Sequence, residues 1–264
     1  MESASTPGAH GASSGLYSFG GASKEALNLY RRGWREILLH GRWTEAERLY
    51  REAAAADPDF LIAKSVLARI TTDSSERQAL YEAVEARRDE VDDAGQLLLN
   101  TYQATLELFA MRERGESGSA EERTAMMHRA VEDYGAFLER YPNEWSVIIE
   151  YVEWVHALEG PQAALDAVES IQASRAQNID FSYFPIHFEA ELGHHERAAE
   201  MAEAFAQRID IPDAPQPHFL SALLAFERGD FDEAESEASR ALALDPRHLL
   251  AERLLRRAKE VKGN

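Results

Sequence analysis

Two stretches of this chain share one spacing of small, apolar and breaker residues, and they decide its fold. Residues 41–58 read GRWTEAERLYREAAAADP, and residues 229–246 read GDFDEAESEASRALALDP. Each begins with glycine and has an alanine five residues later. Apolar residues follow four and seven beyond that alanine, and a proline follows twelve beyond it. Intervals of three and four place these residues on one helix face, with glycine and proline suited to the two ends. Each stretch therefore predicts a helix that follows a tight turn and ends near the proline.

The same spacing recurs along the whole chain. Further copies begin at Ala79, Ala130, Ala164 and Ala198, and the copy at Ala130 also keeps its proline. From Ala46 to Ala234 the leading alanines are 33, 51, 34, 34 and 36 residues apart. A period of this length indicates stacked helix pairs, because one pair cannot bury its apolar face alone. The interval of 51 predicts an enlarged central repeat at about residues 92–141.

This pattern resembles the tetratricopeptide repeat (TPR) family, whose signature ends in Ala-x3-aromatic-x2-Ala-x4-Pro at a 34-residue period. The resemblance covers about residues 24–262. It implies an all-α, right-handed TPR-like α-solenoid of about six helix pairs plus a C-terminal capping helix, expected at residues 247–261. We expect residues 24–262 to form a single repeat domain. The Gly- and Ser-rich residues 1–23 are expected to form a flexible tail.

Composition excludes several classes of protein. The chain has 264 residues, no cysteine and a formal net charge of −19. Without cysteine there is no disulfide scaffold, thiol nucleophile or Cys-ligated metal. Such an acidic chain argues against a nucleic-acid partner, since phosphates would be repelled. No stretch approaches the ~20 apolar residues of a membrane span. We therefore expect a cytoplasmic chain that binds a protein or peptide, as a monomer or weak homodimer.

The acidity is unevenly distributed along the chain. Residues 24–58 carry a net charge of +1 and residues 247–264 carry +4, so the negative charge lies between them. One interpretation is an acidic outer face that attracts a basic protein. The other is salt adaptation or a general compositional habit that has no bearing on partners.

A group of basic and polar side chains lies at the N-terminal end of the expected concave face. The family's repeat geometry places Asn28, Arg31 and Arg35 on that face of the first unit, and Lys64 on that of the second. Together they could hold a carboxylate or an acidic peptide, in a position similar to the carboxylate clamp of chaperone-binding TPRs. The alternative is a solvated basic face that pairs with neighbouring glutamates.

An apolar stripe lies toward the other end of the chain. Phe219, Leu223 and Phe226 are spaced four and three apart, and the same geometry places them on the concave side. If exposed, they would form a groove for a peptide or helix, or a surface for self-association. If buried, they are packing between repeats.

No set of residues in the sequence indicates a catalytic site. The folded region has no phosphate-binding glycine loop and no His-Glu-x-x-His motif, and the adjacent His194 and His195 would diverge on one helix. We expect no catalytic residue, no metal and no cofactor. The function expected is a non-catalytic protein-interaction scaffold that binds an extended peptide or helix in the concave groove. The alternatives are an assembly or regulatory subunit that binds through its acidic outer face, and an enzyme with a shallow site around His156 and His187.

Overall fold

The computed structural model describes residues 16–173 and 183–263. Within these ranges it contains thirteen α-helices and no strand, which confirms the predicted all-α repeat fold. The first six helices are α1 Lys24–Arg35, α2 Trp43–Ala56, α3 Leu61–Ile70, α4 Ser74–Glu85, α5 Asp93–Glu113 and α6 Ala120–Arg140. The remaining helices are α7 Trp145–Glu159, α8 Pro161–Ala173, α9 Phe184–Glu191, α10 His195–Ala206, α11 Pro215–Glu227, α12 Phe231–Leu244 and α13 Leu249–Gly263. None of the described helices is both long and apolar enough to cross a bilayer.

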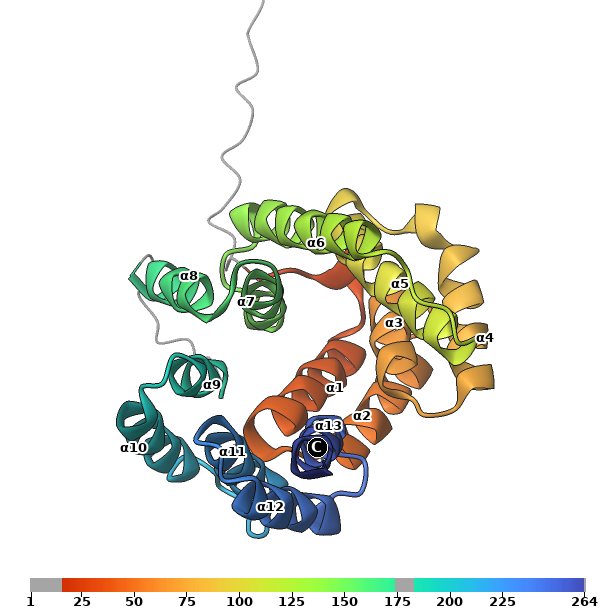
Figure 1. The fold of residues 1–264 in the computed structure, drawn as a ribbon. Coiled ribbons are helices and arrows are strands. Elements are labelled where there is room, and N and C mark those ends of the chain that lie inside the picture. The colour runs from red at the N-terminus through yellow and green to blue at the C-terminus, as the bar shows by residue number, and fades with distance from the viewer. Residues whose placement is uncertain (1–15, 174–182, 264) are drawn as a thin grey trace, which may run out of the picture.

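The helices form six successive pairs and one last helix. Each odd-numbered helix packs on the even-numbered helix that follows it, and α13 packs on α11 and α12. Helices α5 and α6 have 21 residues each and are the longest, which accounts for the 51-residue interval between repeats. Figure 1 shows the pairs arranged around a ring, with α1, α7, α9, α11 and α13 toward its inside.

In most helix pairs, the repeat spacing correctly predicts which face of the second, even-numbered helix is buried. The leading alanines Ala46, Ala130, Ala164, Ala198 and Ala234 are all buried. Small side chains at these positions let the two helices of a pair approach closely.

The copy assigned to α4 is one residue out of register. Ala79, Ala83 and Ala86 are exposed, whereas Val84 is buried and Leu80 packs against the core. Larger aliphatic side chains at positions 80 and 84 bury more apolar surface than the three alanines would.

Residues 16–23, assigned to the tail by the sequence, pack against the solenoid. Tyr17 and Phe19 are buried among rings of several helices, and the Tyr17 ring centroid lies 5.2 Å from that of Phe137. The Tyr17 hydroxyl donates to Asp92 at 2.5 Å. Two aromatic side chains supply enough apolar surface to fix this segment, although its composition is that of a flexible linker. Residues 1–15 lie outside the described residues.

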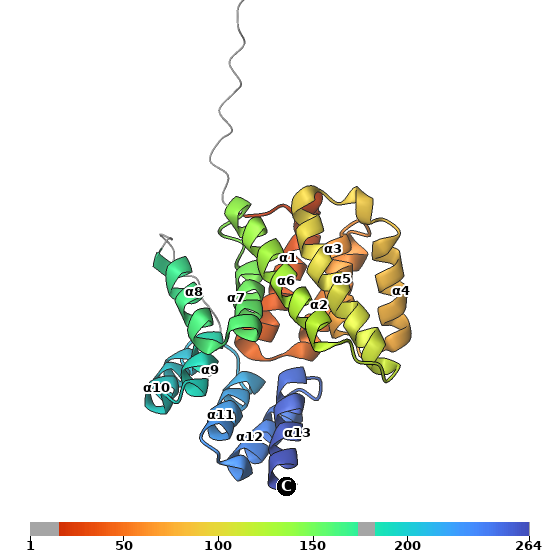
Figure 2. The same ribbon diagram turned by 45° about the horizontal axis from the view of Figure 1, so that its top comes forward.

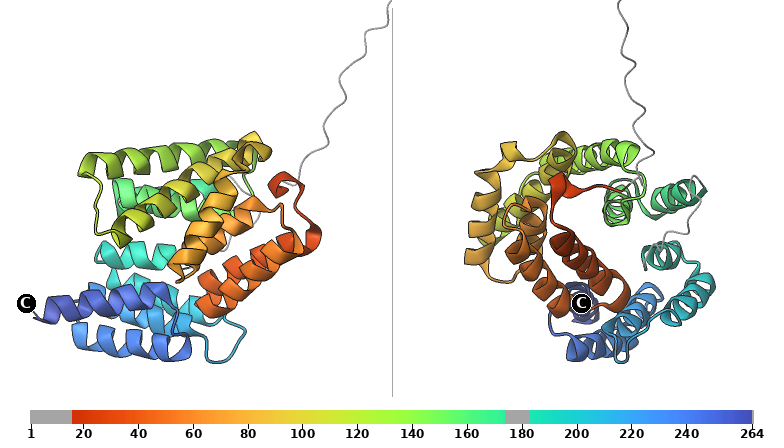
Figure 3. Two further views of the ribbon diagram at one scale, coloured as in Figure 1. Left: turned by 90° about the vertical axis from the view of Figure 1, so that its right-hand side faces the viewer. Right: turned by 180° about the vertical axis from the view of Figure 1, so that it is seen from behind.

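The solenoid closes on itself. Thr44 at the start of α2 hydrogen-bonds Asp245 at the end of α12, and Arg247 donates to the carbonyl of Ile70 at 3.0 Å. Arg247 also forms an ion pair with Glu47 of α2. In Figure 2 the last helices lie beneath the first ones, and Figure 3 shows α1 crossing the middle of the ring. The concave side is therefore a closed interior with α1 inside it.

Candidate binding site

Helix α1 is amphipathic, and its polar face is basic. Ala26, Tyr30, Gly33 and Trp34 are buried on one side of the helix. The Ser23 hydroxyl caps its first turn by accepting from the backbone N–H of Ala26 at 3.3 Å. The opposite side carries the polar residues at intervals of three and four: Lys24, Asn28, Arg31, Arg32 and Arg35.

This face of α1 borders a surface hollow of about 420 Å³, which we call the basic hollow. Its lining residues are Lys24, Leu27, Asn28, Arg31, Arg32 and Arg35 of α1 and Trp145 at the start of α7. The structure thus brings together three of the residues singled out in the sequence, Asn28, Arg31 and Arg35. Lys64 lies elsewhere, and its ammonium group donates to the carbonyl of Pro58 at 2.6 Å.

The cations of the basic hollow differ in whether they already form ion pairs within the protein. Arg31 donates to the Glu144 carboxylate at 2.8 Å and to the backbone carbonyl of Tyr17 at 3.3 Å. The Glu144 side chain is fully buried, and burial raises its pKa while the Arg31 guanidinium opposes that rise. Arg31 therefore compensates a buried carboxylate and serves the fold.

The other polar side chains of the hollow are more available. Arg35 reaches Asp210 at 3.3 Å, but both side chains are exposed, so this pair is weak. The side chains of Lys24, Asn28 and Arg32 have neither a hydrogen bond nor an ion pair within the described ranges. Two cations and an amide beside the half-buried Trp145 are therefore free to contact a ligand.

The apolar stripe on α11 does not form an open groove. Phe219 is 2% exposed and Leu223 is 5% exposed, while Phe226 is half-buried. The ring centroid of Phe219 lies 5.4 Å from that of Tyr183 and 4.9 Å from that of His248. Helix α11 packs against α9 and α13 of the neighbouring units, so this stripe is packing between repeats. The sequence could not distinguish this packing from an exposed stripe.

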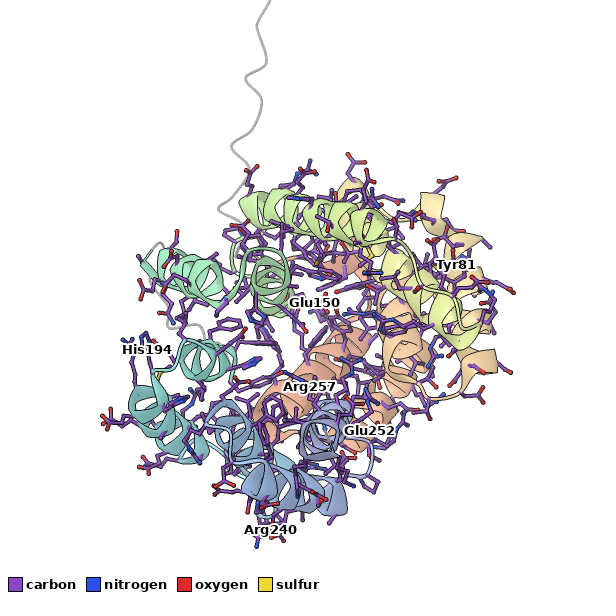
Figure 4. The ribbon with its side chains drawn as sticks, in the orientation of Figure 1. Tyr81, Glu150, His194, Arg240, Glu252 and Arg257 are labelled. Atoms are coloured by element: carbon purple, nitrogen blue, oxygen red, sulfur yellow. The ribbon has the colours of Figure 1, made fainter. Side chains whose placement is uncertain are left out.

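The interior of the ring contains a second hollow of about 460 Å³, which we call the inner cavity. Residues from α1, α2, α3, α5, α6, α7, α9 and α13 line it, including Trp34, Trp43 and Trp154. Figure 4 shows Glu150 of α7 and Arg257 of α13 on the inner side of the ring, whereas Tyr81, His194 and Arg240 lie toward the outside.

The histidines on α7 and α9 form a small polar cluster. His156 contacts the Glu191 carboxylate at 2.6 Å, and the ring of His156 stacks on that of Phe188 with centroids 4.6 Å apart. Burial, then the neighbouring His156, lowers the pKa of His187 to about 4. In the described part of the chain, no group of three His, Cys, Asp or Glu side chains is placed to hold a metal ion.

Sequence reasoning missed several residues that line the two hollows. Lys24 and Arg32 lie four residues on either side of Asn28, so helical periodicity alone could have added them to the basic face. Glu150 and Glu153 offered no such signal. Their place in the inner cavity depends on which helices the closed ring brings together.

Comparison with known proteins gives little guidance. No protein-family model matches the chain, and no similar curated protein was found. Among solved structures, the crystal structure of the APC/C hetero-tetramer Cut9–Hcn1 matches with 16% sequence identity and a TM-score of 0.39. That match covers 90% of this chain and 46% of the other, so this chain spans about half its length. A likeness of this degree says nothing about function, which has to be argued from the residues.

Proposed function

We propose that this chain is a non-catalytic protein-interaction module whose basic hollow binds an acidic segment of a protein partner. The observation that carries the proposal is the set of unpaired side chains of Lys24, Asn28 and Arg32 around Trp145. Their donors converge on one hollow of a chain whose net charge is −19.

The chemistry of the hollow favours carboxylates over other groups. Lys and Arg side chains supply only hydrogen-bond donors, and charge-assisted bonds to carboxylates are the stronger kind. The indole of Trp145 and the aliphatic side chain of Leu27 add apolar surface against which a peptide can pack. An acidic segment with one apolar residue would satisfy both parts of the hollow.

A peptide titration tests this proposal. The probe is the peptide Glu-Asp-Leu-Glu-Asp-Ala-amide with fluorescein on its N-terminal amine, and the readout is fluorescence anisotropy at low and high salt. We expect the double variant Lys24→Ala/Arg32→Ala to bind about five- to tenfold more weakly and to show a flatter salt dependence. Both side chains are exposed and unpaired, so the fold should be retained.

The matched control removes the same charge elsewhere. Arg129→Ala/Arg140→Ala deletes two exposed cations from α6, neither of which lines the basic hollow. This variant should bind within about twofold of the parent chain. Equal weakening in both double variants would show that the peptide responds only to net charge, and would contradict the proposal.

A further inference from the structure

The inner cavity differs from the basic hollow in both its walls and its charges. Aromatic rings from five elements line it: those of Trp34, Trp43, Phe109, Trp154, Tyr183 and Phe184. The charged residues among its lining are Arg69, Arg112, Glu150, Glu153 and Arg253. What the cavity can bind depends on which of these charges are already compensated within the protein.

Arg69 and Glu150 compensate each other. The Arg69 guanidinium donates to Glu150 at 2.6 Å, and only 2% of the Glu150 side chain is exposed. Tyr134 also donates to the Glu150 carboxylate, and the Arg69 guanidinium lies 4.6 Å from the centre of the Tyr102 ring. This pair is a satisfied network within the protein, so it leaves no free charge for a ligand.

Glu153 follows Glu150 by three residues on α7 and so projects from the same side of the helix. Its side chain is exposed to the cavity and has neither a hydrogen bond nor an ion pair within the part of the chain that is described. Protein nevertheless surrounds it, and burial followed by the nearby Glu150 carboxylate raises its pKa. Glu153 is thus an accessible carboxylate on the cavity wall that lacks an ion-pair partner among the described residues.

We infer that the inner cavity is a second binding site, which takes a lysine or arginine side chain of a protein segment against the Glu153 carboxylate. A cation there gains the charge pairing that Glu153 lacks. The surrounding indole and phenyl faces attract cations as well. The chain's net charge of −19 raises the local concentration of basic segments. The site is independent of the basic hollow and has the opposite charge preference.

Arg112 and Arg253 are the features that an anionic ligand would use instead. Both are exposed residues at the cavity, and Arg253 partly offsets the rise in the Glu153 pKa. Their side chains are longer than that of Glu153 and can turn away from the cavity toward water. We therefore favour a basic ligand, and an anionic one becomes an outcome of the test.

Three tripeptides test the inference: acetyl-Leu-Lys-Leu-amide and the versions with Gln or Glu in place of Lys. Tryptophan fluorescence reports on binding, because three of the chain's four tryptophans line the cavity. All titrations use the full chain carrying Lys24→Ala/Arg32→Ala, so that the basic hollow does not contribute. We expect the Lys peptide to bind at least about tenfold more tightly than the Gln and Glu peptides.

Two variants test whether Glu153 is responsible for the preference for the Lys peptide. Glu153→Gln should abolish the preference for the Lys peptide, while Glu159→Gln, which removes the same charge from the exposed end of α7, should retain it. Three results would overturn the inference: equal or tighter binding of the Glu peptide, a preference that survives Glu153→Gln, or no binding of any tripeptide at millimolar concentration. Circular dichroism melting checks that each variant is folded.

Discussion

Thr44 at the start of α2 donates its backbone N–H at 2.9 Å and its hydroxyl at 2.7 Å to Asp245, which lies 201 residues further along the chain. Arg42, the residue that precedes α2, makes no side-chain cap. Asp245 therefore caps the first turn of α2 from the far end of the chain, and it also accepts from the backbone N–H of Arg247 at 2.9 Å. One carboxylate joins the beginning and the end of the solenoid.

Removing one bond of this junction should weaken the whole fold modestly. Thr44→Val loses the hydroxyl donor and leaves a buried acceptor partly unsatisfied, so we expect a loss of about 1 kcal/mol in the free energy of unfolding. Thr124→Val on the exposed face of α6 should change it by less than ~0.5 kcal/mol. Urea denaturation measures both. Hydrogen exchange should accelerate at the start of α2 and in the turn before α13, and unchanged exchange there would contradict the closed ring.

Substituting alanine for glycine should have opposite effects on stability in α1 and in α6. A Cβ on Gly33 would lie 2.8 Å from two ring carbons of Tyr50, so Gly33→Ala should destabilise the chain by about 1–3 kcal/mol. A Cβ on Gly135 of α6 would meet its nearest neighbour, the Tyr151 ring, only at 4.0 Å. Gly135→Ala should therefore stabilise by about 0.5–1 kcal/mol. Thermal and urea unfolding of the two variants test this contrast, and a stable Gly33→Ala would show that the helices are less tightly packed.

Arg31→Ala should destabilise the fold in a pH-dependent way. It leaves the buried Glu144 carboxylate without its guanidinium, and we expect a loss of about 3 kcal/mol near neutral pH. Burial already raises the Glu144 pKa, and the variant raises it further, so the folded variant binds a proton at a pH where the unfolded chain does not. The loss should therefore shrink as the pH falls from 8 to 5. Arg32→Ala should be nearly neutral at both pH values, and an equal effect from both arginines would contradict this assignment.

Two histidines should stay neutral well below their ordinary range. Burial is the largest cause that lowers the pKa of His187 and of His248, each to about 4. Between about pH 6.5 and 4 the unfolded chain binds protons that the folded chain does not, so the free energy of unfolding should fall as the pH falls through that window. Nuclear magnetic resonance titration of the imidazole protons measures both values. A midpoint near 6.5 for either ring would contradict the surroundings that the structure gives it.

The repeat pattern predicted the helix pairs well because the stacking of neighbouring units depends on local spacing. The buried alanines at positions 46, 130, 164, 198 and 234 lie where that spacing placed them. In α4, three alanines matched the spacing while Leu80 and Val84 offered more apolar surface, and the larger side chains determined the register.

The closure of the ring could not be predicted from any one repeat. Thr44, Asp245 and Arg247 are ordinary polar residues near helix ends, and only the summed rotation of six helix pairs brings them together. That closure brings Glu153 of α7 and Arg253 of α13 to the lining of one cavity. The basic face of α1 was predictable in part, because it depends on periodicity within a single helix.

The most direct test of the proposed function follows the indole N–H signals of the four tryptophans during titration with the acidic hexapeptide. Trp145 lines the basic hollow, whereas Trp34, Trp43 and Trp154 line the inner cavity. We predict that the Trp145 signal shifts with peptide concentration while the other three stay in place, and that Lys24→Ala/Arg32→Ala suppresses the shift. Movement of the other three signals with Trp145 unchanged, or no movement of any signal, would contradict binding at the basic hollow.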